Sequence, residues 1–408
     1  MTARPFDALS LAQLRQRSSL KWQHYGPDVL PLWVAEMDVR LAPEIVEVLD
    51  AAVRSGDTGY PNFGGTYKEA LRDFASERWD WEPDPADMLL CADVMSGIRA
   101  VLRRFAKPEG AVLIPSPVYP PFAMFTREIG RRVVPVGLTE AGRLDVAAID
   151  AALGQEEPGH RADREGRTIV LLCSPHNPTG VVHTADELAG VAAAAERHGA
   201  LVVVDEVHAP LVPTGTAFVP WHTIAEQGYV VTSAAKAFNL AGLKAGLIVG
   251  SAGAGALLRR MPESIGYGGS HLGVIGHAAG YRAQPSWLDD VNANIADNRV
   301  LLSELLAQRL PGVRYRVPEA SYLAWLDMRG LGLGADPAGV LLRRGRIALT
   351  SGLRFGPGGA GHARLNFACS ESVLVDAVDR MAHAVATQAE MGAQVPGAGG
   401  GESSDSPT

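Results

Sequence analysis

The chain has little of what marks several large classes of protein. It contains only three cysteines, Cys91, Cys173 and Cys369, which are too few and too widely spaced for a disulfide framework or a zinc site. No apolar run approaches the roughly 18 residues that a transmembrane helix needs. The polar N-terminus lacks the apolar stretch of a secretory signal peptide. We therefore expect no metal, no membrane association and a reducing, cytoplasmic location.

Excess positive charge is also missing. The 37 basic and 45 acidic residues give a net charge of −8, and no basic stripe is present. The basic cluster at Arg99, Arg103 and Arg104 has helical spacing, which is typical of a solvated helix face. Nucleic acid is therefore not an expected partner. A hydrophobic content of 47% with 20% charged residues is ordinary for a globular enzyme with a small-molecule substrate.

The length of 408 residues exceeds what one hydrophobic core usually serves. Apolar runs alternate with helical stretches in the middle of the chain, which favours an α/β fold with a mostly parallel sheet. The expected strands are 111–114, 168–173, 200–204, 229–232 and 245–250. We expect a large domain with a smaller α+β domain, with the chain divided at 1–45 (N-terminal segment joining the small domain), 46–285 (large domain), 286–390 (small domain) and 391–408 (disordered tail).

Helix signals are clearest at 184–198. Thr184 and Glu187 fit a capping box, and Gly199 follows the last turn. A long helix is expected from Pro285 towards Pro311. The polar stretch 155–167 is expected to be an exposed loop, and 321–328 and 364–368 are expected to be strands of the smaller domain.

Three short segments each supply one group that a site for pyridoxal 5′-phosphate (PLP) needs. The chain reads S-P-H-N-P-T-G at 174–180, V-V-V-D-E-V-H at 202–208 and S-A-A-K-A-F-N at 233–239. Lys236 follows an apolar strand, and ligands of open α/β sheets bind where strands end. A lysine forms a Schiff base with the aldehyde and then acts as a base. A surface lysine is the alternative, but the company of the other two segments favours the cofactor.

Asp205 ends the run 201–204, where a carboxylate is poorly solvated and needs a cation. A pyridine nitrogen would serve, and the ion pair would keep the ring protonated as the better electron sink. His208 would support Asp205, or would simply be packed or solvent-facing. Asn177 lies in a proline-rich turn that would direct its amide at the phenolic oxygen of the cofactor. The alternatives are a helix-capping aspartate and a plain turn.

The cofactor phosphate would need backbone N–H groups, hydroxyls and a cation. Val94 and Met95 open a helical stretch and would provide the amides. Ser233 and Lys244 flank Lys236 and would add the hydroxyl and the charge. These residues are expected to bind the phosphate because Lys236 is expected to bind the aldehyde.

Two further residues complete the expected site. Tyr119 follows the strand at 111–114, and an aromatic ring there would stack on the pyridine face. Arg364 would clamp a substrate α-carboxylate through a bidentate pair. Core packing and a structural salt bridge are the respective alternatives.

Together these segments are specific, and from about residue 20 to 387 the chain resembles fold-type I PLP enzymes of the aspartate aminotransferase superfamily. It is most similar to the cystathionine β-lyase branch often called MalY/PatB. The resemblance is carried by K-W at 21–22, L-P-L-W-V-A-E-M-D at 30–38, T-G-Y at 58–60, P-V-Y-P-P-F at 117–122, C-S-P-H-N-P-T-G at 173–180, D-E-V-H at 205–208, K-A-F-N-L-A-G-L-K at 236–244, Y-L-A-W-L-D at 322–327 and R-L-N-F-A-C at 364–369.

The resemblance implies a PLP-dependent transferase-like fold with a seven-stranded type of sheet, and a homodimer with active sites at the interface. Tyr60 would reach the cofactor phosphate of the neighbouring subunit. The backbone at Val34 and Ala35 would lie beside the substrate carboxylate. Three features depart from the family pattern: Ala35 is followed by glutamate where aspartate is commoner, Ala235 replaces a serine before Lys236, and 155–167 looks like an insertion.

The expected activity is that of a carbon–sulfur β-lyase, which converts cystathionine or a related S-substituted cysteine to a thiol, pyruvate and ammonia. An aminotransferase acting on an L-amino acid uses the same residues and is the alternative. A third interpretation is a regulatory PLP-binding protein with little catalysis, against which the intact Lys236, Asp205 and Arg364 argue.

Overall fold

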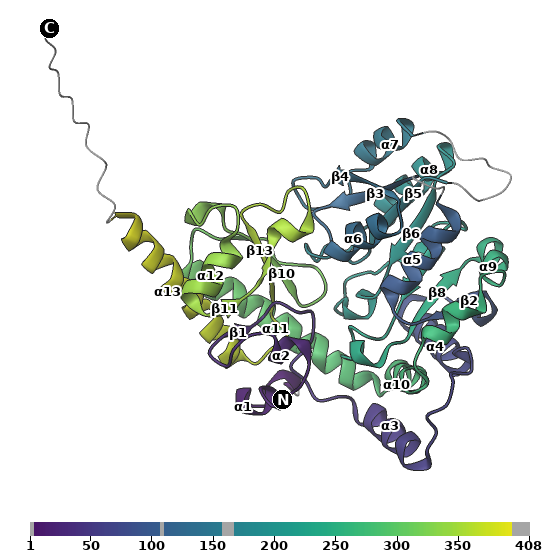
Figure 1. The fold of residues 1–408 in the computed structure, drawn as a ribbon, viewed down its shortest axis with the longest axis horizontal. Helices are drawn as coiled ribbons and strands as arrows, with labels where there is room; N and C mark the ends of the chain where they lie inside the picture. The colour runs from purple at the N-terminus through teal and green to yellow at the C-terminus, as the bar shows by residue number, and fades with distance from the viewer. Residues whose placement is uncertain (1–3, 107–109, 157–166, 394–408) are drawn as a thin grey trace, which may run out of the picture.

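Seven strands form the larger sheet of the computed structural model, which describes residues 4–106, 110–156 and 167–393. Their order is β2-β8-β7-β6-β5-β3-β4 (Figure 1). Neighbours from β7 to β4 are parallel, whereas β8 is antiparallel to both β2 and β7. The predicted, largely parallel α/β sheet is confirmed. The strands are β2 (Met88–Cys91), β3 (Ala111–Ser116), β4 (Arg132–Gly137), β5 (Ile169–Cys173), β6 (Leu201–Asp205), β7 (Tyr229–Thr232) and β8 (Gly246–Gly250).

Both faces of this sheet are buried. Successive side chains of a strand point to opposite faces, so Val112 packs in one core and Leu113 in the other. Helices α5 (Val94–Phe105) and α6 (Pro120–Glu128) supply apolar residues to the first core. Helices α7 (Val146–Gly154) and α8 (Ala185–Arg197) supply the second. Burial on both faces gives the strands the continuous apolar runs from which the sequence predicts them.

Strand β4 was not predicted, because its pattern is weaker. It lies at the edge of the sheet and pairs only with β3. Its side chains are mostly exposed or half-buried, and it contains Pro135. A proline is tolerated on an edge strand, where one row of N–H groups needs no partner.

A second, four-stranded sheet has the order β12-β13-β10-β9 and is antiparallel (Figure 1). Near it, the N-terminal strand β1 pairs in parallel with β11, so the first segment of the chain contacts residues from its last quarter. The strands are β1 (Leu30–Pro31), β9 (Arg314–Tyr315), β10 (Leu323–Asp327), β11 (Ile347–Ala348), β12 (Thr350–Ser351) and β13 (His362–Asn366).

Helix α11 (Pro285–Arg309) lies between the two sheet-containing regions in Figure 1. It packs against α13 and also holds the N-terminus, because Asn294 Oδ1 accepts a hydrogen bond from Phe6 N at 3.2 Å. The remaining helices are α1 (Leu11–Leu14), α2 (Leu20–Gln23), α3 (Pro43–Ser55), α4 (Gly65–Trp79), α9 (Ala252–Leu258), α10 (His271–Arg282), α12 (Pro337–Gly345) and α13 (Glu371–Ala393).

The helix predicted at 184–198 is confirmed as α8, including its capping box. Thr184 Oγ1 accepts from Glu187 N at 3.2 Å, and Glu187 Oε2 accepts from Thr184 N at 2.8 Å. The helix predicted after Pro285 is confirmed as α11. Most of the expected loop at 155–167 and most of the expected C-terminal tail lie outside the described residues.

Among residues 4–106, 110–156 and 167–393, none of the helices is both long and apolar enough to cross a membrane. Within the same residues, no group of three or more histidine, cysteine, aspartate or glutamate side chains is arranged to hold a metal ion.

Candidate active site

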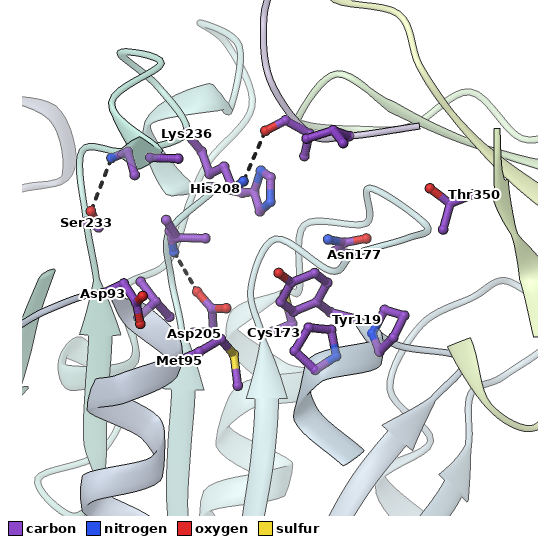
Figure 2. Close-up of a pocket in the computed structure, with 18 of the residues that line it drawn as sticks. Asp93, Met95, Tyr119, Cys173, Asn177, Asp205, His208, Ser233, Lys236 and Thr350 are labelled. Carbon is purple, nitrogen blue, oxygen red and sulfur yellow. Dashed lines mark hydrogen bonds between the residues drawn. The ribbon is translucent and has the colours of Figure 1, made fainter. Parts of the chain in front are cut away.

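A pocket of about 340 Å³ opens where the parallel strands of the larger sheet end. Figure 2 shows Cys173 and Asp205 at its floor, at the ends of β5 and β6. The opposite wall comes from the N-terminal segment and the smaller sheet, through residues that include Trp33, Thr350 and Arg364. The carboxyl end of an open α/β sheet is the usual place for a ligand.

Apart from Tyr60, every site residue predicted from the sequence lines this pocket. They are Val34, Ala35, Val94, Met95, Tyr119, Asn177, Asp205, His208, Ser233, Lys236, Lys244 and Arg364. Tyr60 is 89% exposed and lies outside the pocket of its own chain. Trp33 and Arg364, which are 331 residues apart in sequence, are therefore brought to one cavity.

Asp205 is a buried carboxylate to which no cation is bonded among the described residues. One oxygen accepts a hydrogen bond from Val207 N at 3.0 Å. Burial raises the pKa of Asp205 from its usual 3.8 to about 7, against the smaller opposing effects of that hydrogen bond and of Lys236. A positively charged ring nitrogen placed here would relieve this cost.

The Lys236 ammonium donates a hydrogen bond to the Ala35 carbonyl at 3.0 Å (Figure 2). Although the whole residue is only partly buried, burial of its amine and the nearby Arg364 charge lower the pKa to about 8. A lysine with a pKa near neutrality has a substantial unprotonated fraction and is suited to act as a nucleophile and a base.

Arg364 on β13 is buried and contacts no carboxylate among the described residues. Its Nη1 donates to Asn177 Oδ1 at 3.1 Å, its Nη2 donates to the Trp33 carbonyl at 2.9 Å, and its buried Nε has no partner. Burial lowers its pKa to about 10. A buried guanidinium with an unused donor is a fitting receptor for a carboxylate.

Asn177 therefore has a second contact that the sequence did not indicate. The sequence suggested that its amide meets the cofactor, and the structure shows its oxygen bound to Arg364. Since the amide nitrogen has no hydrogen bond among the described residues, one side chain links the arginine and the turn at 174–180 and still has a donor available.

The opposite end of the pocket is formed by the N-terminus of α5. Its N-cap residue is Asp93, whose side chain accepts from Ser96 N at 2.8 Å and pairs with Lys244 Nζ at 2.9 Å. Ser233 Oγ donates to the Ala245 carbonyl at 2.7 Å and accepts from Ala235 N at 3.2 Å. Helix N–H groups, an ammonium and a hydroxyl meet here, as an anion site requires.

His208 lies in the pocket wall, but its imidazole contacts Ser321 and not Asp205. Its Nδ1 lies 3.0 Å from Ser321 Oγ. Burial, with the charges of Lys236 and Arg364, lowers its pKa to about 3, so it is neutral near pH 7. Tyr119 lies near the middle of the cavity in Figure 2, and burial raises the pKa of its hydroxyl.

Several lining residues were missed from the sequence. Asp93 precedes V-M-S-G and has a capping-box signal with Ser96 that was available in the sequence. Thr350 and Arg354 come from a region without a motif, and only the fold brings them beside Arg364. Trp33 adjoins the nominated Val34, and Cys173 ends β5.

The chemistry of these groups fits PLP. A buried carboxylate, a lysine of lowered pKa and the N–H groups of a helix N-terminus beside the Asp93–Lys244 ion pair suit a ring nitrogen, an aldehyde and a phosphate respectively. Arg364 is left for the substrate.

Comparisons with known proteins agree with this fit. Residues 27–381 match the family model described as aminotransferase class I and II. A Mycobacterium tuberculosis protein named "Putative cystathionine beta-lyase" is 46% identical, over 94% of this chain and 99% of the relative. A "Cystathionine beta-lyase" of Corynebacterium glutamicum is 32% identical, over 91% and 98%. A Corynebacterium diphtheriae structure described as a "putative plp-dependent beta-cystathionase" has a TM-score of 0.86 and 31% identity, over 93% and 98%.

Fold and pocket together define a PLP-dependent enzyme built on a transferase-like α/β sheet. The chain belongs to the aminotransferase class I and II family, and the relatives that are 46% and 32% identical to it are named putative cystathionine beta-lyase and cystathionine beta-lyase. The resemblance seen in the motifs is confirmed.

Proposed function

We propose that this protein is a carbon–sulfur β-lyase that cleaves L-cystathionine or a related S-substituted cysteine. The products would be a thiol, which is homocysteine from cystathionine, together with pyruvate and ammonia. The proposal rests above all on Lys236, Asp205 and Arg364 meeting in one pocket of a chain whose relatives are named cystathionine beta-lyase.

Each residue has a proposed role in holding the cofactor. Asp205 would hold the protonated ring nitrogen, with His208 beside it, and Asn177 would donate to the phenolic oxygen. Tyr119 would stack on the ring. Val94, Met95, Ser233 and Lys244 would bind the phosphate, to which Tyr60 of a second subunit would add its hydroxyl. When bound, PLP supplies an electron sink for the negative charge that develops at the substrate Cα.

The remaining roles concern the substrate. Arg364 would bind the α-carboxylate through a bidentate pair, and the Val34–Ala35 backbone would flank it. Held at this point, the substrate presents its Cα–H bond to Lys236, which removes the proton as the base. The thiolate then leaves Cβ and is protonated, and hydrolysis of the remaining unsaturated amine yields pyruvate and ammonia.

We also propose a homodimer and the division of the chain into residues 1–45, 46–285 and 286–390. Several large apolar side chains are exposed on and after α3 and beside α10, and the Phe63 and Tyr267 rings contact each other at a tilt of 50°, with centroids 5.7 Å apart. These exposed apolar side chains, together with the highly exposed Tyr60, favour a subunit contact in this region. The set is Val46, Val53, Tyr60, Phe63 and Tyr267. Equilibrium sedimentation tests the assembly.

The decisive experiment uses purified protein saturated with PLP and L-cystathionine as the sole added substrate. Stoichiometric pyruvate and free thiol, without any keto acid, are the expected result. Amino-group transfer to an added keto acid with no pyruvate from cystathionine would instead identify an aminotransferase. That second function is favoured by the aminotransferase description of the matching family. The same pocket residues serve both reactions.

A further inference from the structure

Two arginines belong to the wall of the pocket that the smaller sheet contributes. Arg364 is buried on β13, whereas Arg354 is exposed and comes from the 3₁₀ turn Gly352–Phe355 that follows β12. Both line the same cavity as Lys236 and Asp205. They differ in depth, one lying within the wall and the other near solvent.

Arg354 is not committed to any other contact. Among the residues that the structure describes, it has no hydrogen-bond or salt-bridge partner. Arg329 and Arg346, two other arginines of the same region, pair with Asp327 and Asp28. The Arg354 charge also acts unfavourably on Arg364 and contributes to the lowered pKa of that group. Two cations near each other without a carboxylate are stabilised when anions bind.

The other charges of the pocket already have roles or partners. Four lining residues are cationic, namely Lys236, Lys244, Arg354 and Arg364, and two are acidic, Asp93 and Asp205. Asp93 pairs with Lys244, and Asp205 acts electrostatically on Lys236. The two arginines are the cations that remain. A substrate α-carboxylate satisfies Arg364 and leaves Arg354 for a second anion.

We propose that Arg354 binds a carboxylate at the far end of the sulfur substituent. The preferred substrates are then S-substituted cysteines whose substituent ends in a carboxylate, as that of cystathionine does. Arg354 is a specificity residue in this proposal, since its contact lies away from the bonds that break. The proposal rests on the proposed lyase function, because it assigns the two ends of a lyase substrate to two arginines.

The test compares two substrates whose sulfur substituents have the same carbon-chain length, S-carboxyethyl-L-cysteine and S-propyl-L-cysteine, with pyruvate as the readout. In Arg354→Gln, kcat/KM for the carboxylate substrate is expected to fall about tenfold, a modest loss because the arginine is exposed. The loss should appear in KM, since the contact is the same before and during bond cleavage. The propyl substrate should change by less than about twofold.

A charge reversal provides a second, independent measurement. Arg354→Glu should favour S-aminoethyl-L-cysteine over S-carboxyethyl-L-cysteine and so invert the preference of the unmodified enzyme. Arg354→Lys should retain part of the preference, because the charge remains while the bidentate geometry is lost. Arg316→Gln is the matched control, since Arg316 is an exposed arginine outside the pocket and should change neither substrate.

A binding measurement removes turnover from the test. Pimelate, a dicarboxylate that cannot be cleaved and that has about the same chain length between its carboxylates as S-carboxyethyl-L-cysteine, should bind the PLP-loaded enzyme about tenfold less tightly in Arg354→Gln. Equal losses for both cysteine substrates, or none for either, would overturn the specificity role. If the unmodified enzyme released no pyruvate from any of these substrates, the proposed lyase function itself would be wrong, whatever the role of Arg354.

Discussion

Two buried carboxylates in this protein have opposite surroundings. Asp38, in the N-terminal segment, pairs with Lys21 at 2.6 Å, and both side chains are fully buried. Asp205, at the end of β6, is bonded to one backbone N–H and, within the part of the chain that the structure describes, to no cation. The lysines differ in the same way, because within that part of the chain Lys21 binds a carboxylate and the Glu36 carbonyl, whereas Lys236 binds the Ala35 carbonyl alone.

The difference separates an ion pair that the chain completes itself from two pocket residues for which we propose a role in binding and catalysis. Burial raises the pKa of Asp38, and the charge of Lys21 opposes that rise. In the N-terminal segment, therefore, Lys21 compensates the buried negative charge of Asp38. In the pocket the chain leaves Asp205 and Lys236 with incomplete partners, and a ligand can complete them. Substitutions at the two sites should accordingly affect different properties.

The largest expected effect is on catalysis. Lys236→Ala removes the proposed base and should lower kcat by about 10² to 10⁴ fold or more, measured as pyruvate release from cystathionine. Because a buried amine is costly, the thermal unfolding midpoint should not fall. Retention of normal steady-state elimination would show that another group takes the proton.

The largest expected effect on stability comes from the other lysine. Lys21→Met leaves Asp38 buried without its cation and should cost about 3 to 5 kcal/mol of unfolding free energy, measured by chemical denaturation. Lys21→Met combined with Asp38→Leu should recover much of this loss. Arg54→Met is the control, because the Arg54–Asp50 pair is exposed and should contribute less than about 1 kcal/mol. Equal losses of unfolding free energy in Lys21→Met and Arg54→Met would contradict the view that burial makes the Lys21–Asp38 pair important for stability.

Asp205→Asn should act in the opposite direction on stability. The unfolded chain releases this proton near pH 3.8, whereas the folded cofactor-free protein holds it to about pH 7. Stability contributed by Asp205 is therefore present below pH 4 and lost as the pH rises through 7. The cofactor-free variant should match the unmodified protein near pH 4 and exceed it by at most about 4 kcal/mol above pH 7.

The same substitution should weaken PLP binding about tenfold or more, because a charged partner of the ring nitrogen is lost. Fluorescence titration with PLP measures this affinity. Asp38→Asn serves as the comparison and should lower stability without changing PLP affinity. If the stability difference between Asp205→Asn and the unmodified protein did not change with pH, the folded protein would not raise the pKa of Asp205.

The sequence indicated the pocket residues Lys236 and Asp205 better than it indicated the buried Lys21–Asp38 ion pair. Lys236 and Asp205 follow apolar strands, and residues at strand ends of a parallel sheet meet at one edge, so local patterns were sufficient. Lys21 and Asp38 were seen only as parts of matching motifs, since nothing local shows that they are buried together. Arg354 was missed for a similar reason, because its place in the wall depends on how the two sheets pack.

The segment 33–38 connects the two sites, and the smallest predicted effect tests that connection. Asn366 Nδ2 donates to the carbonyls of Val34 at 2.6 Å and Glu36 at 2.7 Å, so it fixes the backbone between the ion pair and the pocket. Asn366→Ala should cost about 2 kcal/mol of stability and also raise KM about tenfold.

A matched variant separates these two consequences. Asn298 is also buried, and its amide donates to the Phe367 and Cys369 carbonyls at 2.8 and 2.7 Å. Those two residues flank Ala368, whose carbonyl accepts from Asp38 N at 3.0 Å, so Asn298 acts on the ion-pair end of segment 33–38, whereas Asn366 holds the end beside the pocket. Asn298→Ala should cause a similar loss of stability with KM unchanged. If both variants shift KM equally, the effect arises from general loosening of the fold. If only Asn366→Ala does, the backbone that the N-terminal ion pair helps to hold is also the backbone that positions the substrate.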